Sequence, residues 1–547
     1  MNFLFSFVIA LFLTMVLMPP LMRLAGPLRL VDLPGPRKVH PGVVPRCGGV
    51  AVIAGALTPV FMLVPLSTEL LSFLIGGAII VSFGIWDDSR ELSFHWKLTG
   101  QILGTLVLLN GGFVLHHLPL CGLDPVHPII AYPVTAIFIL GITNAINLSD
   151  GLDGLAAGCS LITLTMIAFL AYPVQGYSVV IIALAIMGGI VGFLRFNTYP
   201  ALVFLGDAGS QFLGFSAAAF TIYLLEDVHP ALSPALPLLL FGLPILDTAW
   251  VMAQRVVRGR SPFRADQNHV HHKLLTLGFR HHEAVGFIYL LHGVLVLGAY
   301  VLTYESDILI IAVFVVFCAL VLGAYYLARR RDWRLHPPPA DAGFVERRNI
   351  WLRGLDWLPL VTVRALAYGI GLFLIVGAVT AHAIAGDFAV VAFALITLLA
   401  FAAVFLRAYT KIFARCGLYV ASALVAYLLI PLPPDAWLTD FAINLFFAAL
   451  AGVMLIAIRV TRRDFFRITP QDLLILFFAI VIPNLSGEFV GDFPIGETVF
   501  RLAVLFYAAE FLLNSGQDYF GEVHSYRVLR VTTVLALAII GVRGVLF

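Results

Sequence analysis

Long apolar runs alternate with short polar stretches along most of the chain. About eleven runs before residue 330 are long enough to cross a bilayer, and about seven more follow residue 357. The first group lies at 3–22, 48–66, 70–86, 98–115, 131–147, 155–173, 177–195, 209–225, 234–253, 284–303 and 307–328. The second group lies near 358–384, 387–406, 416–431, 438–458, 470–484, 497–513 and 529–546. The pattern predicts an all-α polytopic membrane protein.

A basic stretch with three consecutive prolines, Pro337 to Pro339, interrupts the two groups of apolar runs. Domain boundaries usually fall in exposed linkers of this kind. We therefore expect a membrane domain at 1–330, a cytoplasmic linker at 331–357 and a C-terminal transmembrane region of unknown function at 358–547.

The composition excludes a soluble globular protein. The 547 residues are 61% hydrophobic and 12% charged, with a mean hydropathy of +0.99, which is more apolar surface than a soluble core can bury. The five cysteines form no C-x-x-C pair, which argues against a disulfide framework or a structural zinc site. The first run lacks a basic segment and a small-residue cleavage motif before Arg23, so we interpret it as a retained helix.

The positions of Lys and Arg predict the orientation. With the N-terminus outside, the outer loops between the first eleven helices contain no Lys or Arg, as the positive-inside rule requires. The inner loops contain Arg37, Lys38, Arg46, Arg90, Lys97, Arg258, Arg260, Arg264, Lys273 and Arg329 to Arg331, and later Lys411, Arg415, Arg462, Arg463, Arg467 and Arg527. Arg501 and Arg543 depart from this pattern.

This topology places five polar motifs on the cytoplasmic side. They are PGPRKVHPG (Pro34 to Gly42), WDDSRELSFHWK (Trp86 to Lys97), NAINLSDGLDG (Asn144 to Gly154), NTYPALVFLGDAGS (Asn197 to Ser210) and RADQNHVHHKLL (Arg264 to Leu275). The assignment used only Lys and Arg, yet it gathers the carboxylate- and histidine-rich motifs on one side. A single site at the inner membrane surface is therefore expected.

Each motif also has a plainer interpretation. The Asp-Gly pairs of the third motif form turns readily, but two turns do not require Asn144 and Asn147 at the same three-residue spacing. Asp87 and Asp88 could form a solvated helix end, and Ser210 could cap a helix. A zinc tract of histidines is disfavoured because H-x-H-H lacks the i,i+4 spacing and has no cysteine nearby.

Taken together, the motifs favour phosphate chemistry. Mg²⁺ typically binds one or two carboxylates and completes its shell with substrate oxygens, while Arg, Lys and His neutralise phosphate charge. A membrane-embedded site that opens to the cytoplasm suggests one lipid substrate and one soluble, phosphorylated substrate.

The motifs resemble those of the polyprenyl-phosphate N-acetylhexosamine-1-phosphate transferase family. The matching text is VDLPGPRKVHPGVVPRCGG, GIWDDSRELS, NAINLSDGLDGLAAG, FLGDAGSQFLGF and SPFRADQNHVHH, in order, over about residues 1–330. The H-x-H-H form resembles the UDP-GlcNAc:undecaprenyl-phosphate branch more than the UDP-MurNAc-pentapeptide branch, which tends to have three consecutive histidines. The eleven-helix count also agrees with the family's fold.

The resemblance implies transfer of HexNAc 1-phosphate, GlcNAc 1-phosphate first of all, from a UDP-sugar to undecaprenyl phosphate, with release of UMP. It implies Mg²⁺ as cofactor, with Mn²⁺ as an alternative. It implies a multi-pass protein of the bacterial inner membrane whose site faces the cytoplasm and whose product begins a cell-surface glycan such as an O-antigen. No nucleic-acid partner is expected, and homo-oligomerisation is left open.

The resemblance also implies roles for residues. Asp207 is the leading metal ligand, with Asp87 and Asp88 as further candidates beside the lipid phosphate, and Asp87 as the candidate proton acceptor. The substrate-binding candidates are Arg37, Lys38, His40, Lys97, Asn144, Asn147, Asp150, Asp153, Asn197, Arg264, His269, His271 and His272. Gln267 departs from the family, which often has Arg or Lys there, and Arg264 is a candidate to compensate; the exact sugar therefore stays open.

Two other classes compete with the transferase. Polar groups within membrane segments, such as Asp247, would suit a transporter, but a transporter predicts polar residues near the midplane and repeated halves. A non-catalytic scaffold would not require these acidic motifs to coexist. The region 358–547 lies outside the resemblance and carries no motif that we can assign.

Overall fold

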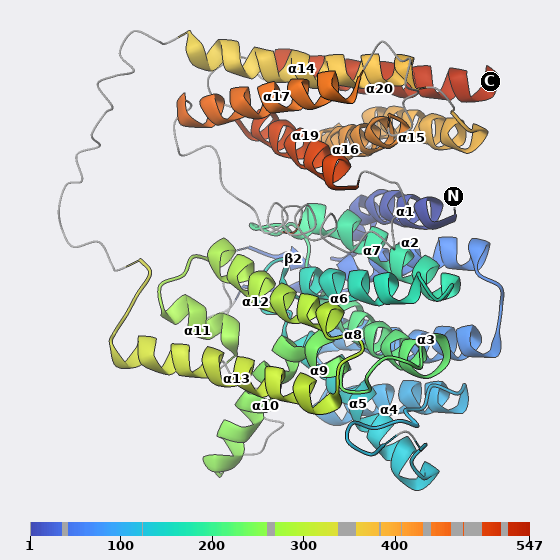
Figure 1. Cartoon of the computed structure of the whole chain (residues 1–547), viewed down its shortest axis with the longest axis vertical. Coiled ribbons are helices and arrows are strands. Elements are labelled where there is room, and N and C mark those ends of the chain that lie inside the picture. The colour runs from blue at the N-terminus through green and yellow to red at the C-terminus, as the bar shows by residue number, and fades with distance from the viewer. Residues whose placement is uncertain are drawn as a thin grey trace. The chain divides into compact units, whose positions relative to one another are not determined.

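The computed structural model describes residues 2–34, 42–122, 124–259, 269–336, 357–381, 384–405, 407–429, 439–460, 474, 495–515 and 523–546. The chain divides into two compact units, Met1–Ala340 (unit 1) and Asp341–Ile468 with Asp472–Phe547 (unit 2). Both are built from helices (Figure 1), twelve of which, among the described residues, are long and apolar enough to cross a membrane. The predicted all-α membrane fold is thereby confirmed.

The described part of unit 1 contains eleven helices of 16 residues or more. They are α1 (Asn2–Leu24), α2 (Gly48–Leu63), α3 (Thr68–Arg90), α4 (Phe94–Asn110), α5 (Pro128–Leu148), α6 (Leu155–Ala171), α7 (Tyr177–Asn197), α8 (Gly206–Tyr223), α10 (Gly242–Val257), α12 (His281–Val301) and α13 (Asp307–Arg330). Shorter elements are η1 (Leu224–Val228), α9 (Pro237–Leu240) and α11 (Val270–Thr276). The helix starts and ends place Asp87, Lys97 and Asp207 in terminal turns.

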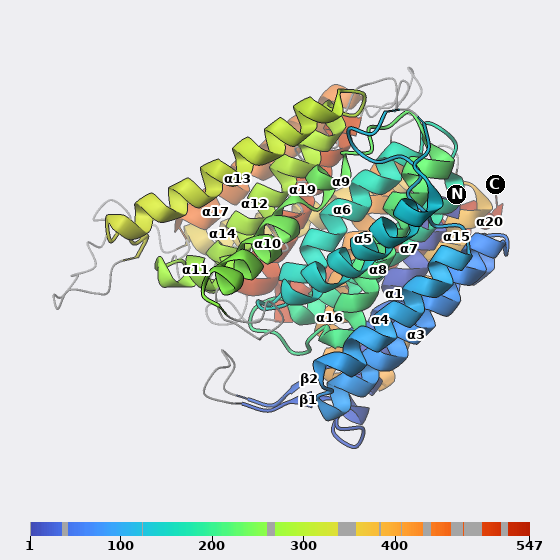
Figure 2. The same cartoon turned by 90° about the horizontal axis from the view of Figure 1, so that it is seen from below.

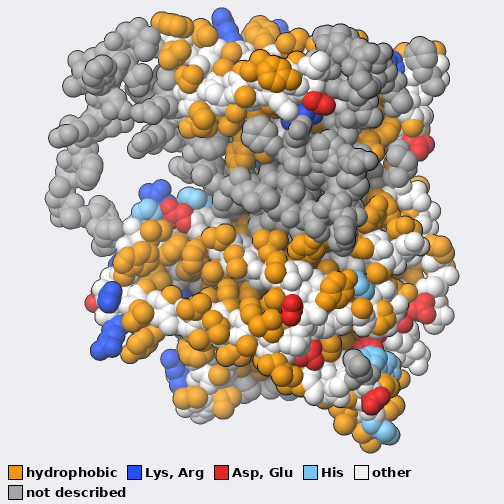
Figure 3. Space-filling model, in the orientation of Figure 1, with side chains coloured by type: hydrophobic (Ala, Val, Ile, Leu, Met, Phe, Trp, Pro, Cys, Tyr) orange, Lys and Arg blue, Asp and Glu red, His pale blue; other side chains and the backbone are white. Residues whose placement is uncertain are grey.

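Hydrophobic side chains cover most of the face of unit 1 drawn in Figure 3, and the Lys and Arg side chains visible there gather at one edge. Helix α13 is the clearest case, because only 6% of its most apolar window is buried. Such a surface is compatible with lipid contact rather than with water.

A two-residue antiparallel ribbon, β1 (Val31–Asp32) with β2 (Val44–Pro45), follows α1. Figure 2 shows it beside the ends of α3 and α4. The Phe204 N–H donates to the Pro45 carbonyl at 2.7 Å, and the Gly48 N–H donates to the Phe204 carbonyl at 3.0 Å. The ribbon is thus tied to the loop that precedes α8.

Helix α8 is the central helix of unit 1, with 94% of the window in Gly206–Val228 buried. Small residues allow its neighbours to approach closely. A Cβ at Gly49 of α2 would lie 2.3 Å from the Gly209 Cα, and a Cβ at Gly214 would lie 2.8 Å from the Thr143 Cα of α5. This packing brings polar residues of α3, α5 and α8 to one end of the bundle.

The apolar run predicted at 234–253 is broken between α9 and α10. Pro244 has no N–H, so it cannot donate to the Leu240 carbonyl as a continuous helix would require. The Thr163 hydroxyl of α6 donates to that carbonyl instead, at 3.0 Å, and also lies 2.9 Å from His292 Nε2 of α12. The break separates α9 from α10, and α6 takes up the carbonyl that it leaves free.

The described part of unit 2 contains six long helices: α14 (Leu358–Thr380), α15 (Gly386–Phe405), α16 (Thr410–Leu428), α17 (Asp440–Val460), α19 (Ile495–Ser515) and α20 (Val523–Leu546). The short η3 (Arg407–Tyr409) precedes α16. The span predicted at 470–484 lies almost entirely outside the described residues.

The two arginines that departed from the charge pattern have partners inside unit 2. Arg501 is buried, and its Nη2 donates to Asn444 Oδ1 at 2.8 Å. Arg543 donates to the Ala378 carbonyl at 2.9 Å, near the C-terminus of α14, where a cation is favoured. Their positions reflect helix–helix contacts rather than loop charge.

Candidate active site

A cavity of about 890 Å³ lies at the end of unit 1 where the polar motifs meet. Each of the five motifs contributes to its wall. The predicted site residues among its lining are Asp87, Asp88, Lys97, Asn147, Asp150, Asp153, Asn197, Asp207 and His272, with Gly42 from the first motif. Arg37, Lys38, His40 and Arg264 lie outside the described residues.

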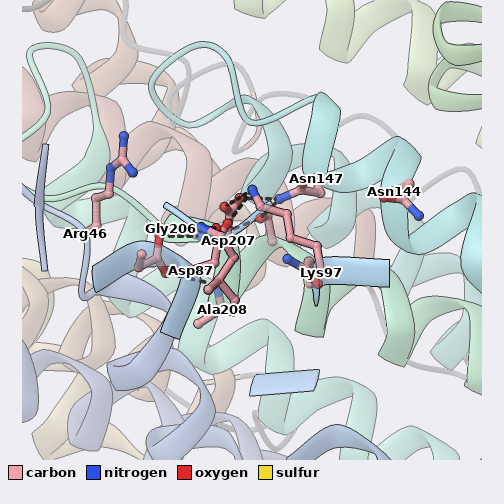
Figure 4. Close-up of polar contacts among 12 residues, drawn as sticks. Arg46, Asp87, Lys97, Asn144, Asn147, Gly206, Asp207 and Ala208 are labelled. Atoms are coloured by element: carbon pink, nitrogen blue, oxygen red, sulfur yellow. Dashed lines mark hydrogen bonds and ion pairs between the residues drawn. The ribbon is translucent and has the colours of Figure 1, made fainter. Parts of the chain in front are cut away.

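Asp207 occupies the first turn of α8 and faces the cavity (Figure 4). Its Oδ2 accepts from Lys97 Nζ at 3.0 Å, and its Oδ1 accepts from Asn147 Nδ2 at 2.7 Å. Asn147 Nδ2 also lies 2.8 Å from Ser210 Oγ. The carboxylate is therefore oriented from both sides, yet its side chain keeps 24% of its surface exposed.

Asp88 is buried and supports the start of α8. Its Oδ1 accepts the Asp207 N–H at 2.9 Å and its Oδ2 accepts the Ala208 N–H at 3.1 Å. A carboxylate in this position satisfies two N–H groups that a helix start leaves unpaired, and it interacts favourably with the helix dipole. Asp88 thereby fixes the backbone that carries Asp207.

Asp87 joins the end of α3 to the start of α4. Its Oδ1 accepts the Leu92 N–H at 2.6 Å, and its Oδ2 forms an ion pair with Lys97. Lys97 therefore bridges Asp87 and Asp207, and its side chain remains 32% exposed. One cation connects the second and fourth motifs.

Two predicted amides stabilise the surroundings of the cavity. Asn197 is buried; its Oδ1 accepts the Gly154 N–H at 2.7 Å and its Nδ2 donates to the Val203 carbonyl at 2.7 Å. Asn144 is not among the lining residues. It donates to Gln101 Oε1 at 2.8 Å, and Gln101 Nε2 lies 3.1 Å from Gln211 Oε1. Neither glutamine is among the residues that the motifs led us to select.

The histidine motif divides between the wall and the interior. His272 lines the cavity, whereas His269 and His271 are buried. His269 Nδ1 lies 2.9 Å from Asp247 Oδ2. The other carboxylate oxygen of Asp247, Oδ1, accepts the Val270 N–H at 2.7 Å. Asp247 of α10 thus holds the start of α11, a contact that no motif predicted.

His271 packs behind the third motif. A Cβ at Gly151 would lie 2.3 Å from His271 Nε2, so a larger residue there would require the ring to move. Burial, with a smaller contribution from the neighbouring His272, lowers the pKa of His271 to about 3. The ring is therefore neutral at physiological pH and supports the Asp150–Asp153 turn by packing.

Negative charge is concentrated around Asp150. Burial raises the pKa of Asp150 to about 8, with further contributions from Asp207, Asp88 and Asp153. Among the described residues no three His, Cys, Asp or Glu side chains form a preassembled metal-binding cluster. The arrangement instead suits an ion such as Mg²⁺, which needs one or two carboxylates and takes its other oxygens from substrate and water.

Comparison with known proteins places these residues in a family. Residues 70–225 match the model described as glycosyl transferase family 4. The chain is 32% identical over 319 residues, which is 58% of this chain and 88% of the relative, to a probable undecaprenyl-phosphate N-acetylglucosaminyl 1-phosphate transferase of Bacillus subtilis. The chain belongs to the polyprenyl-phosphate N-acetylhexosamine-1-phosphate transferase family.

Two further relatives extend the similarity. A decaprenyl-phosphate N-acetylglucosaminephosphotransferase of Mycobacterium leprae is 34% identical over 311 residues, covering 50% of this chain and 77% of that protein. An undecaprenyl-phosphate alpha-N-acetylglucosaminyl 1-phosphate transferase of Escherichia coli is 27% identical over 343 residues, covering 60% and 90%. None of these three alignments covers two thirds of the present chain.

The cavity wall also contains residues that the family motifs did not lead us to select. Arg46 forms an ion pair with Asp32. Tyr199 stacks on His281, with ring centroids 4.4 Å apart. His281 Nε2 accepts the Asp153 N–H at 3.0 Å. Arg46 stands within the quoted motif text, but nothing in the sequence distinguished it from an ordinary inner-loop cation.

Proposed function

We propose that the chain transfers HexNAc 1-phosphate, GlcNAc 1-phosphate in the first instance, from a UDP-sugar to undecaprenyl phosphate. An oxygen of the lipid phosphate attacks the β-phosphorus, the bond to the bridging oxygen breaks, and UMP leaves with that oxygen. The product is an undecaprenyl diphospho-sugar that begins a lipid-linked cell-surface glycan. The names of the relatives support the GlcNAc donor and the polyprenyl acceptor.

The observation that carries the proposal is Asp207, held between Lys97 and Asn147 in a cavity crowded with carboxylates. Asp207 and Asp150 would hold Mg²⁺ or Mn²⁺. When bound, the ion neutralises the diphosphate and the departing UMP, the main requirement of phosphoryl transfer. Asp88 and Asp87 are less suited as ligands, because both are buried and each accepts from a backbone N–H, whereas the Asp207 side chain keeps 24% of its surface exposed.

Lys97 is suited to bind a phosphate oxygen from its position between Asp87 and Asp207. The lipid phosphate needs little help in losing a proton, because a phosphate monoester has its second pKa near 6. We therefore assign Asp87 mainly to positioning Lys97. His272 also lines the cavity and would contact the soluble substrate.

Purified full-length protein incubated with undecaprenyl phosphate, Mg²⁺ and a panel of UDP-sugars tests the proposal. We expect UMP release and a lipid product whose mass corresponds to an added HexNAc phosphate, with UDP-GlcNAc the best donor. Uptake of a UDP-sugar or lipid into vesicles without UMP release would replace the transferase by a transporter. A preference for UDP-MurNAc-pentapeptide would move the chain to the other branch of the family.

A further inference from the structure

Three helices of unit 1 each carry an amide side chain one turn away from a residue of the candidate site. The pairs are Lys97 with Gln101 on α4, Asn147 with Asn144 on α5, and Asp207 with Gln211 on α8. Residues three or four positions apart lie on the same face of a helix. We refer to Lys97, Asn147 and Asp207 as the site layer, and to Gln101, Asn144 and Gln211 as the amide layer.

Hydrogen bonds within the amide layer connect the three helices. Gln101 and Asn144 pair through both of their amide groups: Asn144 Nδ2 donates to Gln101 Oε1 at 2.8 Å, and Gln101 Nε2 donates to Asn144 Oδ1 at 3.3 Å. Gln101 Nε2 also donates to Gln211 Oε1 at 3.1 Å. Gln101 of α4 is therefore the centre of the layer, with one partner on α5 and one on α8.

The two glutamines are buried, with 3% of Gln101 and 2% of Gln211 exposed. Hydrogen bonds are stronger where water is excluded, and an amide that loses its partner there is costly. Amides of membrane helices often serve only to join helices. That role explains the bonds at any depth of the bundle, but it does not explain why each amide lies one turn from a site residue.

The two layers have different centres. In the site layer Asp207 of α8 accepts from both Lys97 and Asn147, so α4 and α5 are connected there through Asp207 (Figure 4). In the amide layer Gln101 connects α4 directly to α5. A substrate phosphate that draws Lys97 away from Asp207 would weaken the contacts of the site layer and leave those of the amide layer intact.

We propose that the amide layer holds α4, α5 and α8 in fixed register while the site layer binds substrate. The inference rests on the proposed function, because it needs Lys97 to exchange its contact with Asp207 for a phosphate oxygen. Gln101, Asn144 and Gln211 are not among the residues that line the cavity. They are positioning residues that act through Lys97, Asn147 and Asp207.

The test compares full-length wild type with Gln101→Met and with the double variant Gln101→Met/Gln211→Met. Met is unbranched and similar in length to Gln but has no amide to donate or accept. With UDP-GlcNAc and undecaprenyl phosphate as substrates, kcat should fall roughly tenfold in both variants, because small displacements of the reacting groups slow the reaction strongly. Both KM values should stay within about twofold of the wild type, since the alignment that is lost acts mainly in the transition state.

Thermal stability separates positioning from general loosening of the bundle. Gln101→Met leaves the amides of Asn144 and Gln211 without their partner, so the Tm should fall. Adding Gln211→Met removes one of those amides, so the Tm should partly recover while kcat stays low. Ser6→Ala is the matched control, because buried Ser6 of α1 donates to the Ile181 carbonyl of α7 at 2.6 Å; it should lower the Tm with kcat unchanged.

Hydrogen exchange followed by mass spectrometry tests the layer without reference to turnover. Peptides that cover the cavity ends of α4, α5 and α8 should exchange faster in Gln101→Met than in wild type, and at the wild-type rate in Ser6→Ala. Faster exchange together with a wild type that releases no UMP would reject the transfer reaction but keep the role of the amides in fixing the three helices.

Three results would overturn the inference. The first is wild-type kcat in Gln101→Met. The second is a kcat that recovers with the Tm in the double variant, which would make the loss of activity a consequence of stability alone. The third is unchanged exchange at the cavity ends of α4, α5 and α8 in Gln101→Met.

Discussion

In unit 1 the polar side chains of five separate motifs line one cavity, whereas in unit 2 the buried polar side chains that we can describe mostly contact each other between helices. Asp207 keeps an exposed carboxylate despite two hydrogen bonds. Arg501, by contrast, is almost fully buried against Asn444. Polar side chains that remain open to the cavity can bind substrate. A closed pair, by which we mean two buried polar side chains that bond each other as Arg501 and Asn444 do, mainly fixes how helices pack.

The difference also explains what sequence comparison can detect. Residues 70–225, which match the family model, include the second, third and fourth motifs. Closed pairs in unit 2 require only complementary partners, and many sequences provide them. Unit 2 can therefore be well packed without a polar motif of the kind that lines the cavity.

The largest expected effect comes from Asp207→Asn. The substitution keeps the shape and the contact with Lys97 but removes the charge that would hold the metal ion, so UMP release should fall at least about a hundredfold. The Tm should change little. Asp387→Asn, an exposed carboxylate of α15, is the matched control in unit 2 and should be fully active. Wild-type turnover in Asp207→Asn, or full activity in EDTA, would remove Asp207 from this role.

Asp88→Ala should lower both activity and stability. It leaves the Asp207 and Ala208 N–H groups at the start of α8 without their acceptor, at a cost of about 1–3 kcal/mol. We expect roughly a hundredfold less UMP release and a Tm lower by several degrees. A variant that loses activity at unchanged Tm would instead indicate that Asp88 contacts the substrate or metal directly.

His271→Ala should act mainly on the soluble substrate. Removal of the ring leaves space behind Gly151 and loosens the turn that carries Asp150 and Asp153. We expect KM for the UDP-sugar to rise about tenfold, as loss of a packed contact in the site would give, with KM for the lipid phosphate nearly unchanged. Equal KM values for the UDP-sugar in mutant and wild type would show that the packing of His271 against Gly151 does not shape the UDP-sugar site.

The sequence was sufficient to predict the all-α fold and to select nine of the 23 residues that line the cavity. It could not distinguish Asn147 from Asn144, because both follow the same three-residue spacing in the third motif. In the structure Asn147 orients Asp207, whereas Asn144 lies away from the cavity wall and binds Gln101. It also could not predict which histidine reaches the wall. That depends on Asp247, which lies 22 residues from His269 and fixes the rotation of α11. Contacts between distant helices decide such details, and periodicity does not encode them.

A truncated chain ending near Ala340 should retain UMP release to within a few-fold. All five motifs lie in unit 1, and domain boundaries usually fall in linkers of this kind. Detergent stability is measured in parallel by size-exclusion chromatography, and some loss there is compatible with an intact site. A truncated protein that is monodisperse and binds UDP-sugar, yet shows no turnover, would mean that unit 2 completes the site or the lipid path.

The smallest expected effect concerns pH. Burial and three neighbouring carboxylates raise the pKa of Asp150 to about 8 in the folded protein, against about 4 in an unfolded chain. The folded state therefore retains a proton that the unfolded state releases, and this contribution to stability is present below about pH 4 and lost as the pH rises through about 8. In EDTA, the Tm of the wild type should fall by a few degrees between pH 6 and pH 9. Mg²⁺ should restore more of it at pH 9 than at pH 6, because the ionised carboxylate binds the cation. Asp150→Asn should remove both effects, and equal pH slopes in mutant and wild type would show that Asp150 does not carry this proton.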